Sequence, residues 1–504
     1  MSKPISVLLA AWLAVSTSLV LATEDETSEP SADVPEPMHF ESEHLIKIDG
    51  NAIVYTATAG TLLMKNTDDE PIAQFGYTAY VKKDGDRQTR PILFAYNGGP
   101  GSASMWLHMG ILGPQRTVVD DTRFTSVGPF QRVDNEYSIL DKADLVMIDP
   151  VGTGFSRAVG KGKGEDFWGV DKDITSVSDF IARYVTDNGR WQSPKYLLGE
   201  SYGGIRSGGV AYELLNRHNM ALNGVILVSP FMDYVAGNAG LKIDLPYINF
   251  FTTFAATAWY HEAIDDRPDD LQAFLREAEA FAIDEYASVL LKGNRASAEE
   301  RQAVLAGMER FTGISAEYWD RANLRIDEGR FAKELLRDER KTVGRIDSRF
   351  VGDGINHIGE SFTYDPFFPA VGPAFTATFN DYYREELGVK TDRRYVTSGG
   401  LWRFWDYTRK QPDQRGASKA PANTAVDLAF TMVQNPHMRV LVQQGYYDLA
   451  TPYGATDYLI DQMDVPDHIR SNLVTEYYEA GHMMYLHPES LVKYKRDLAA
   501  FIDD

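Results

Sequence analysis

The sequence predicts an α/β fold in which a mostly parallel central sheet is covered by helices on both faces. The main indication is a set of short apolar runs, since strands buried on both faces read as continuous hydrophobic segments. These runs span residues 91–96, 145–148, 196–198, 225–228, 440–442 and 473–474. Helical spacing separates several of them, as over residues 174–185. Alternation of strand and helix is the pattern of such a layered sheet.

The regions before and between these runs define the expected domain organisation. Residues 52–55 and 74–80 read as strands of a meander that precedes the parallel part. From 234 to 421 strand-like runs are few, and helical spacing appears over 269–291, 297–311 and 331–336. Ser297 and Glu300 fit a capping box, and Ser315 fits an N-cap. We therefore expect a core formed by residues 41–233 and 422–504, with a largely helical insertion over 234–421.

The N-terminus has the pattern of an export signal. Lys3 precedes a mostly apolar stretch over 5–21, and Val20-Leu21-Ala22 offers small residues for cleavage after Ala22. Residues 1–22 are therefore predicted to be a signal peptide, and residues 23–40, acidic and rich in Pro and Ser, a disordered linker. No second apolar run has the length of a membrane span. We expect an exported protein, periplasmic or secreted, without a stable membrane span after signal removal.

Composition excludes several classes of function. The 504 residues carry a net charge of -22, which argues against nucleic acid as a partner because a phosphate backbone needs a basic face. The chain has no cysteine, so disulfides, thiolate nucleophiles and Cys-based zinc sites are excluded. The 10 histidines are scattered, and His261-Glu262 lacks the second histidine of a zinc helix. We expect no metal and no cofactor, and the sequence leaves the oligomeric state open.

The segment Gly199-Glu200-Ser201-Tyr202-Gly203 contains Gly-x-Ser-x-Gly between an apolar run and a helical pattern. Strand, sharp turn and helix form the context of a nucleophile elbow. Side chains at Gly199 or Gly203 are expected to collide across such a strained turn. Taken alone, the motif also fits a tight turn with a capping serine.

Two further residues follow predicted strands in the order found in α/β-hydrolases, Ser then Asp then His. Asp448 follows the run 440–444, and His482 follows the run 473–478. Because active sites form at the carboxyl ends of parallel strands, we predict a triad of Ser201 as nucleophile, His482 as base and Asp448 as the acid that orients the imidazole. The glycine-rich loop 97–101 follows the run 91–96 and lacks the Lys-Ser/Thr ending of a P-loop. This loop and the N–H of Tyr202 fit an oxyanion hole.

With these motifs in place, the sequence resembles a bacterial-type member of the serine carboxypeptidase family of α/β-hydrolases. The likeness rests on residues 97–104, 149–156, 199–204 and 480–483, with a weaker match around Asp448. It implies an α/β-hydrolase fold with a helical cap. It also implies a peptidase that releases C-terminal residues, through an acyl-enzyme, from peptides with a free C-terminus.

The same resemblance assigns further roles within the site. It gives the oxyanion hole to the backbone N–H groups of Gly99 and Tyr202. It implies that the Asn97 side chain, the Gly98 N–H and Glu200 bind the substrate's free carboxylate. Such a carboxylate needs donors, and Glu200 donates only when it is protonated. The other reading of Glu200 is a structural carboxylate that braces the elbow.

The sequence departs from the family at two positions. Ile111 stands before Leu-Gly-Pro, where a second glutamate is common, so a carboxyl pair sharing a proton is not expected there. Ser102 replaces the usual cysteine of the glycine loop. An esterase or acyltransferase with the same triad therefore remains an alternative, as does a binding protein without catalysis on this scaffold.

The sequence does not decide the role of two further groups of residues. Tyr446, Tyr447, Tyr477 and Tyr478 lie near the triad loops and fit either an apolar subsite or the core. The polar cluster 344–349 has no role that the sequence reveals.

Overall fold

The computed structural model describes residues 34–124, 127–241, 243–412 and 419–503. The predicted signal peptide and residues 23–33 of the predicted linker therefore lie outside the described residues. Residues 39 and 40, at the end of that linker, belong to the first strand.

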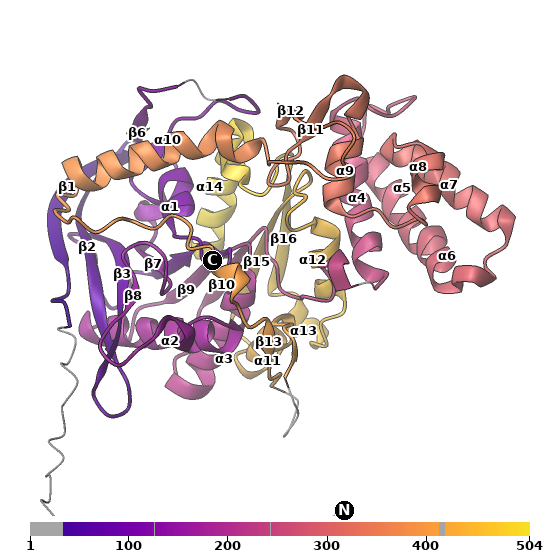
Figure 1. Cartoon of the computed structure of the whole chain (residues 1–504). Coiled ribbons are helices and arrows are strands. Elements are labelled where there is room, and N and C mark those ends of the chain that lie inside the picture. Colours follow the sequence, from indigo (N-terminus) through magenta and orange to yellow (C-terminus); the bar gives the residue numbers. More distant parts are fainter. Residues whose placement is uncertain (1–33, 125–126, 242, 413–418, 504) are drawn as a thin grey trace, which may run out of the picture.

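A sheet of ten strands runs through the centre of the molecule (Figure 1). Its order is β1 (His39–Ile48), β2 (Asn51–Lys65), β3 (Pro71–Lys82), β7 (Asp144–Asp149), β4 (Ile92–Tyr96), β9 (Lys195–Glu200), β10 (Gly224–Val228), β15 (Arg439–Gly445) and β16 (Leu473–Tyr478), with β8 (Arg157–Ala158) paired to β3. Strands β1, β2, β3 and β7 pair antiparallel, and the strands from β7 to β16 pair parallel. The six apolar runs are the six parallel strands, which confirms the predicted fold class.

Helices cover both faces of this sheet, which explains why its parallel strands are apolar throughout. On one face α2 (Val170–Asp187), α3 (Gly203–His218) and α11 (Ala425–Gln434) share a hydrophobic cluster with the strands. On the other face α1 (Met105–Leu107), α10 (Phe367–Asp381) and α14 (Pro488–Asp503) share a second cluster. None of the helices in the described ranges combines the length and the apolar character that crossing a membrane requires.

A group of helices to one side of the sheet has a hydrophobic cluster of its own (Figure 1). It comprises α4 (Leu245–Tyr260), α5 (Leu271–Phe281), α6 (Ala287–Lys292), α7 (Ala298–Thr312), α8 (Ala316–Arg321) and α9 (Glu328–Glu334). Ser297 and Glu300 form the predicted capping box of α7, and the Ser315 side chain accepts a hydrogen bond from the Tyr318 N–H at the start of α8. Tyr447, Leu449 and Tyr453 belong to the same cluster and connect it to the sheet.

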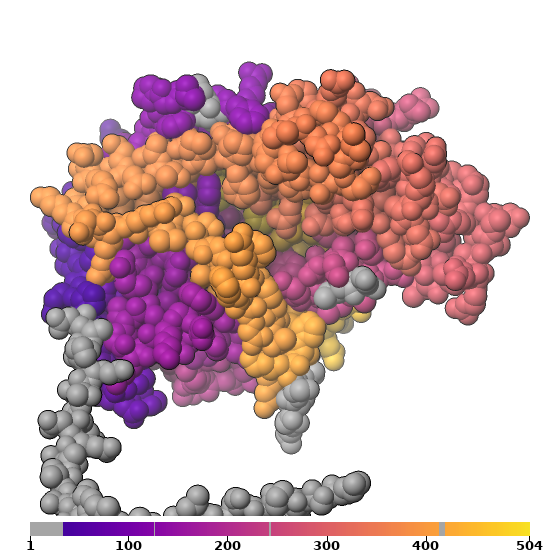
Figure 2. All heavy atoms as spheres, in the orientation of Figure 1, coloured from indigo at the N-terminus to yellow at the C-terminus, as the bar shows by residue number. Residues whose placement is uncertain are grey.

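The later part of the predicted insertion packs against the sheet rather than with α4–α9. Phe375 and Phe379 of α10 are fully buried in the cluster that also holds α14. Beyond α10, the chain crosses the front of the molecule as the orange band of Figure 2. Isolated bridges from Val396 to Gly154 and from Ser398 to Ser102 attach this band to the core.

The remaining elements are short. The pairs β5 (Gln115–Thr117) with β6 (Arg132–Asp134), β11 (Lys341–Val343) with β12 (Val351–Asp353), and β13 (Thr408–Arg409) with β14 (Ala420–Pro421) form two-stranded sheets. Helices α12 (Tyr453–Asp461) and α13 (Asp467–Arg470) connect β15 to β16.

Candidate active site

Ser201 occupies the turn between β9 and α3 in a left-handed backbone conformation, with φ of 65°. Its N–H donates to the Val228 carbonyl at 3.0 Å, and its carbonyl accepts from the Gly204 and Phe231 N–H groups at 2.8 and 2.9 Å. A non-glycine residue in this region is strained and persists only where its surroundings fix it. The three backbone hydrogen bonds supply that fixation, as a nucleophile elbow requires.

Glycines around the elbow allow neighbouring backbone segments to approach closely, but only one of the two predicted collisions is found. A Cβ at Gly199 would lie 2.3 Å from the Gly203 carbonyl oxygen, which agrees with the expected collision. At Gly203 the nearest atom is the Tyr96 carbonyl oxygen at 3.2 Å, so the expected collision there is only a tight contact. Gly98 is a further close approach, where a Cβ would lie 2.4 Å from the Tyr202 nitrogen.

His482 and Asp448 form a buried pair at the carboxyl ends of β16 and β15. His482 Nδ1 lies 2.7 Å from Asp448 Oδ2. Asp448 Oδ1 accepts from the Ala450 and Thr451 N–H groups at 2.8 and 3.0 Å, and the Thr451 hydroxyl donates to Asp448 Oδ2 at 2.6 Å. These donors fix the carboxylate so that it holds the imidazole in one orientation.

The backbone of His482 is fixed on both sides. Its N–H donates to the Ile346 carbonyl at 2.8 Å, and its carbonyl accepts from the Ser229 hydroxyl at 2.8 Å. Burial alone lowers the pKa of the His482 imidazole, but the charge and hydrogen bond of Asp448 outweigh it, and the pKa is raised. A raised pKa makes the imidazole a stronger base.

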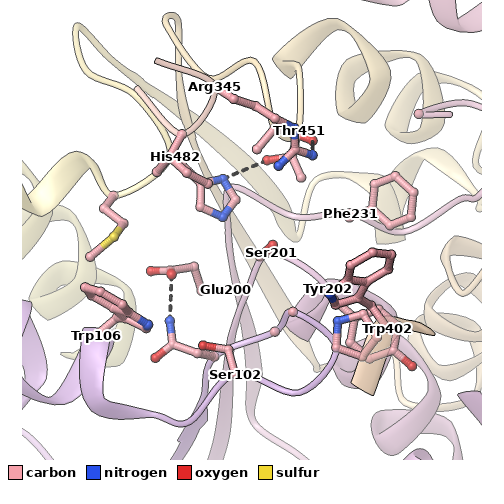
Figure 3. A pocket seen from close by; sticks show the side chains of 18 of the residues that line it. Ser102, Trp106, Glu200, Ser201, Tyr202, Phe231, Arg345, Trp402, Thr451 and His482 are labelled. Atoms are coloured by element: carbon pink, nitrogen blue, oxygen red, sulfur yellow. Dashed lines mark hydrogen bonds between the residues drawn. The ribbon is translucent and has the colours of Figure 1, made fainter. Parts of the chain in front are cut away.

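A pocket of about 540 Å³ brings most of the predicted site residues together (Figure 3). Its lining includes Asn97, Gly98, Gly99, Glu200, Ser201, Tyr202 and His482, while Asp448 lies behind the imidazole. Ser201 lies beneath the imidazole ring (Figure 3), and its hydroxyl forms no hydrogen bond within the described ranges. Catalytic hydrogen bonds are commonly long before substrate binds.

Three backbone N–H groups at the base of the pocket are available to a ligand. Within residues 34–124, 127–241, 243–412 and 419–503, the N–H groups of Gly98, Gly99 and Tyr202 have no acceptor. Elsewhere most backbone N–H groups are satisfied, since leaving one unpaired is costly. The arrangement therefore offers donors to an oxyanion or a carboxylate.

Glu200 lies beside Ser201 and is held by two donors. Asn97 Nδ2 donates to Glu200 Oε1 at 2.6 Å, and the Tyr485 hydroxyl donates to Glu200 Oε2 at 2.7 Å. Burial raises the pKa of Glu200 to about 7, although the charge of His482 and both hydrogen bonds act to lower it. This carboxyl therefore changes its charge near neutral pH.

Tyr485 is the partner of Glu200 that the sequence did not reveal. It lies in η10 (Met484–Leu486), three residues beyond His482, and a Cβ at Gly110 would lie 2.3 Å from its ring. Ile111, at the position of the usual second glutamate, is buried in the cluster of α10 and α14 and is absent from the pocket lining. A tyrosine hydroxyl thus stands beside Glu200 instead of a second carboxyl.

The aromatic lining differs from the tyrosines that the sequence singled out. Tyr446, Tyr447, Tyr477 and Tyr478 do not line this pocket, and Tyr446 stacks on Tyr477 with ring centroids 5.5 Å apart. The core interpretation therefore holds for them. The pocket walls are instead built from aromatic residues of five separate segments without a common motif: Trp106, Phe231 and Tyr234, Phe250, Phe368, and Trp402 with Tyr407.

Within the described segments, no group of three or more His, Asp or Glu side chains is placed to hold a metal ion. The chemistry that these residues can perform is that of a serine nucleophile with a histidine base.

Comparisons with known proteins find similar chains among the serine carboxypeptidases. A family model described as serine carboxypeptidase matches residues 66–308, which include the loop 97–101 and the elbow but neither Asp448 nor His482. The serine carboxypeptidase-like protein 36 of Arabidopsis thaliana is 27% identical over 171 residues, 33% of each chain. The pheromone-processing carboxypeptidase KEX1 of Saccharomyces cerevisiae is 28% identical over 233 residues, 42% of this chain and 29% of that one. The chain thus spans about a third of the length of these curated relatives.

The crystal structure of the KEX1 carboxypeptidase from Saccharomyces cerevisiae is similar in fold, with a TM-score of 0.54 and 16% identity. The likeness covers 89% of this chain and 92% of that structure, so the shared fold extends beyond the segment matched by the family model. Together with the elbow and the glycine loop, these matches lead to one conclusion: the chain is similar to the serine carboxypeptidases, in sequence over residues 66–308 and in fold over most of its length.

Proposed function

We propose that this protein is a serine-type carboxypeptidase that removes C-terminal residues from peptides. The observation that carries the proposal is the 2.7 Å contact between His482 and Asp448 beside Ser201 in a single pocket. The match of residues 66–308 to the serine carboxypeptidase family model supports the reaction class. Donors at Asn97 and Gly98 support a substrate with a free carboxylate.

The proposed reaction follows from these positions. His482 Nε2 takes the proton of the Ser201 hydroxyl as its oxygen attacks the carbonyl carbon of the last peptide bond. The N–H groups of Gly99 and Tyr202 stabilise the oxyanion, each worth about 10²–10³ in turnover. His482 then gives the proton to the leaving amine, and the C-terminal residue departs. Water hydrolyses the acyl-enzyme in the same way and restores Ser201.

Recognition of the free C-terminus is proposed to involve Asn97, Gly98 and Glu200. The Gly98 N–H donates to the terminal carboxylate, and Glu200 donates when it carries its proton. With a pKa of about 7, Glu200 is protonated below neutral pH and negatively charged above it. An ionised Glu200 repels a carboxylate, so we expect cleavage of peptides to weaken as the pH rises above 7.

The test uses an N-blocked dipeptide and its C-terminally amidated twin. Release of the free amino acid from the acid but not from the amide supports the carboxypeptidase. Equal cleavage of both twins, or cleavage of esters alone, refutes it.

An esterase or acyltransferase is the alternative that the second result would establish. One observation favours it: the partner of Glu200 is the Tyr485 hydroxyl rather than a second carboxyl that would strengthen binding of a free C-terminus. Labelling by a fluorophosphonate that disappears in Ser201→Ala, with the fold intact by circular dichroism, supports either enzyme. Failure of the wild type to label would point to a binding protein without catalysis.

We further propose that the protein is exported to the periplasm or beyond, since residues 1–22 have the pattern of a signal peptide. N-terminal sequencing of the mature protein tests this, with Thr23 expected as the first residue. An intact Met1 in a protein that stays inside the cell contradicts it.

A further inference from the structure

The polar segment 344–349 is docked against the loop that carries His482. The Ile346 carbonyl accepts from the His482 N–H at 2.8 Å. Arg349 and Asp347 form a buried ion pair at 2.6 Å, and a Cβ at Gly481 would lie 2.4 Å from the Asp347 Cβ. These contacts give most of the segment a structural role. These contacts do not explain Arg345, whose side chain lines the active-site pocket.

Arg345 has few partners for a residue with five N–H donors. Its side chain is 40% exposed, and Glu328 Oε1 lies 4.0 Å from its Nε. Its Nη2 donates to the Ala450 carbonyl over a long 3.4 Å. Within the described segments its guanidinium has no other hydrogen bond or ion pair. Most of its donors are therefore free to meet a ligand.

Two buried arginines, unlike the partly exposed Arg345, are engaged more fully. Arg206 Nε donates to Asp173 at 2.8 Å, and Arg409 Nε lies 3.1 Å from both oxygens of Asp427. Among the described residues that line the pocket, Arg345 is the only Lys or Arg. It therefore differs from the structural arginines in both its contacts and its place.

The acids nearest to Arg345 do not satisfy it. Asp365 uses its two oxygens to accept from the Ile346 and Phe367 N–H groups at 3.1 and 3.0 Å. Glu328 makes only the 4.0 Å contact, and burial raises its pKa. A carboxylate from a ligand can pair with the guanidinium without breaking a short ion pair.

The position of Arg345 indicates which part of a substrate it meets. In Figure 3, Glu200 and Arg345 lie on opposite sides of the His482 imidazole. If the terminal carboxylate binds beside Glu200, as in the proposed function, the part of the substrate near Arg345 belongs to the acyl side of the cleaved bond. Glu328, Asn238 and Phe250 also line the pocket.

We propose that Arg345 forms a subsite for the carboxylate side chain of the penultimate residue, whose carbonyl Ser201 attacks. The planar guanidinium matches a carboxylate with two parallel hydrogen bonds, which favours an arginine over a lysine for this task. The proposal rests on the proposed function for the direction in which the peptide lies. It makes the protein selective for acidic penultimate residues.

The experiment compares N-blocked dipeptides that share a C-terminal Phe and differ only in a penultimate Glu or Gln. We expect the wild type to cleave the Glu substrate with a kcat/KM about tenfold higher, the scale of one charge-assisted pair that is partly exposed. Arg345→Met should abolish this preference while keeping kcat/KM for the Gln substrate within about twofold. Arg345→Lys should restore part of it. Arg496→Met, an exposed residue of α14 outside the pocket, removes the same charge and should keep the full preference.

A wild type that does not prefer Glu to Gln overturns the proposal. So does a preference that survives in Arg345→Met, or one that appears only when Glu is the last residue.

A second measurement reads the subsite without turnover. N-acetyl-Glu should slow fluorophosphonate labelling of Ser201 about tenfold more effectively than N-acetyl-Gln in the wild type, and equally in Arg345→Met. Equal protection in the wild type refutes the subsite. Protection with this pattern in a protein that cleaves neither dipeptide keeps the subsite and refutes the peptidase instead.

Discussion

Replacing Glu200 with glutamine removes the one carboxyl of the site whose pKa lies near neutrality. Its pKa is about 7 rather than 4.5. At about 1.4 kcal/mol per pH unit, this difference corresponds to roughly 3 kcal/mol of folding free energy. The folded protein holds the proton that the unfolded chain releases from pH 4.5 upward. Stability therefore falls as pH rises from 4.5 to 7, and the whole penalty is present above pH 7.

Glutamine carries no charge and keeps an acceptor for the Asn97 side chain. We therefore expect the free energy of unfolding of Glu200→Gln at pH 8 to exceed that of the wild type by roughly 3 kcal/mol, so that the variant unfolds at a higher urea concentration. At pH 4.5 the two proteins should differ by less than about 1 kcal/mol. The control is Glu309→Gln, an exposed residue of α7 without a side-chain partner in the described ranges, whose stability should follow the wild type. A gain of the same size at both pH values would refute a titrating Glu200.

The same variant separates stability from activity. In the wild type, kcat/KM for an N-blocked dipeptide should fall about tenfold per pH unit above pH 7, as Glu200 loses its proton. Glu200→Gln should remove this fall, since an amide donates at every pH. A wild-type profile that stays flat to pH 9 would show that an ionised Glu200 does not oppose the substrate.

Two further changes test the neighbours of Ser201 and Glu200. Gly98→Ala places a Cβ 2.4 Å from the Tyr202 nitrogen, so kcat should fall by about 10²–10³ while circular dichroism stays unchanged. The control Gly372→Ala, where the nearest atom is 3.9 Å away, should keep full activity; equal losses in both variants would contradict the steric argument. Tyr485→Phe removes a donor that lowers the pKa of Glu200. The fall in kcat/KM should therefore begin about one pH unit higher, and an unchanged profile would contradict the role of this hydrogen bond.

Local patterns predicted the sheet because its six parallel strands are buried on both faces. A strand such as β10 needs an apolar residue at every position, and 225–228 is readable without any partner in view. The helix α10 was not predicted, since Pro373 lies inside it and Pro366 precedes it. Burial of Phe375 and Phe379 against the sheet outweighs the poor helix propensity of the prolines.

The site was predictable where chemistry is encoded in a short motif. Ser201 lies between glycines, and Asp448 and His482 follow strands whose ends meet at one edge of the sheet. Tyr485 was not predictable in its role, because its partner Glu200 lies 285 residues away. The same holds for Gly98, whose strict requirement arises from contact with Tyr202 across two loops.

The order of the strands along the chain also determines when the proposed triad can be complete. Ser201 follows β9, whereas Asp448 and His482 follow β15 and β16, which form the far edge of the sheet and come late in the chain. A nascent polypeptide that has folded only through β10 holds Ser201 without His482. In the proposed function, such a chain has a serine without its base until β16 has joined the sheet. The moment at which Ser201 begins to react with a fluorophosphonate would then mark completion of the sheet rather than formation of the elbow.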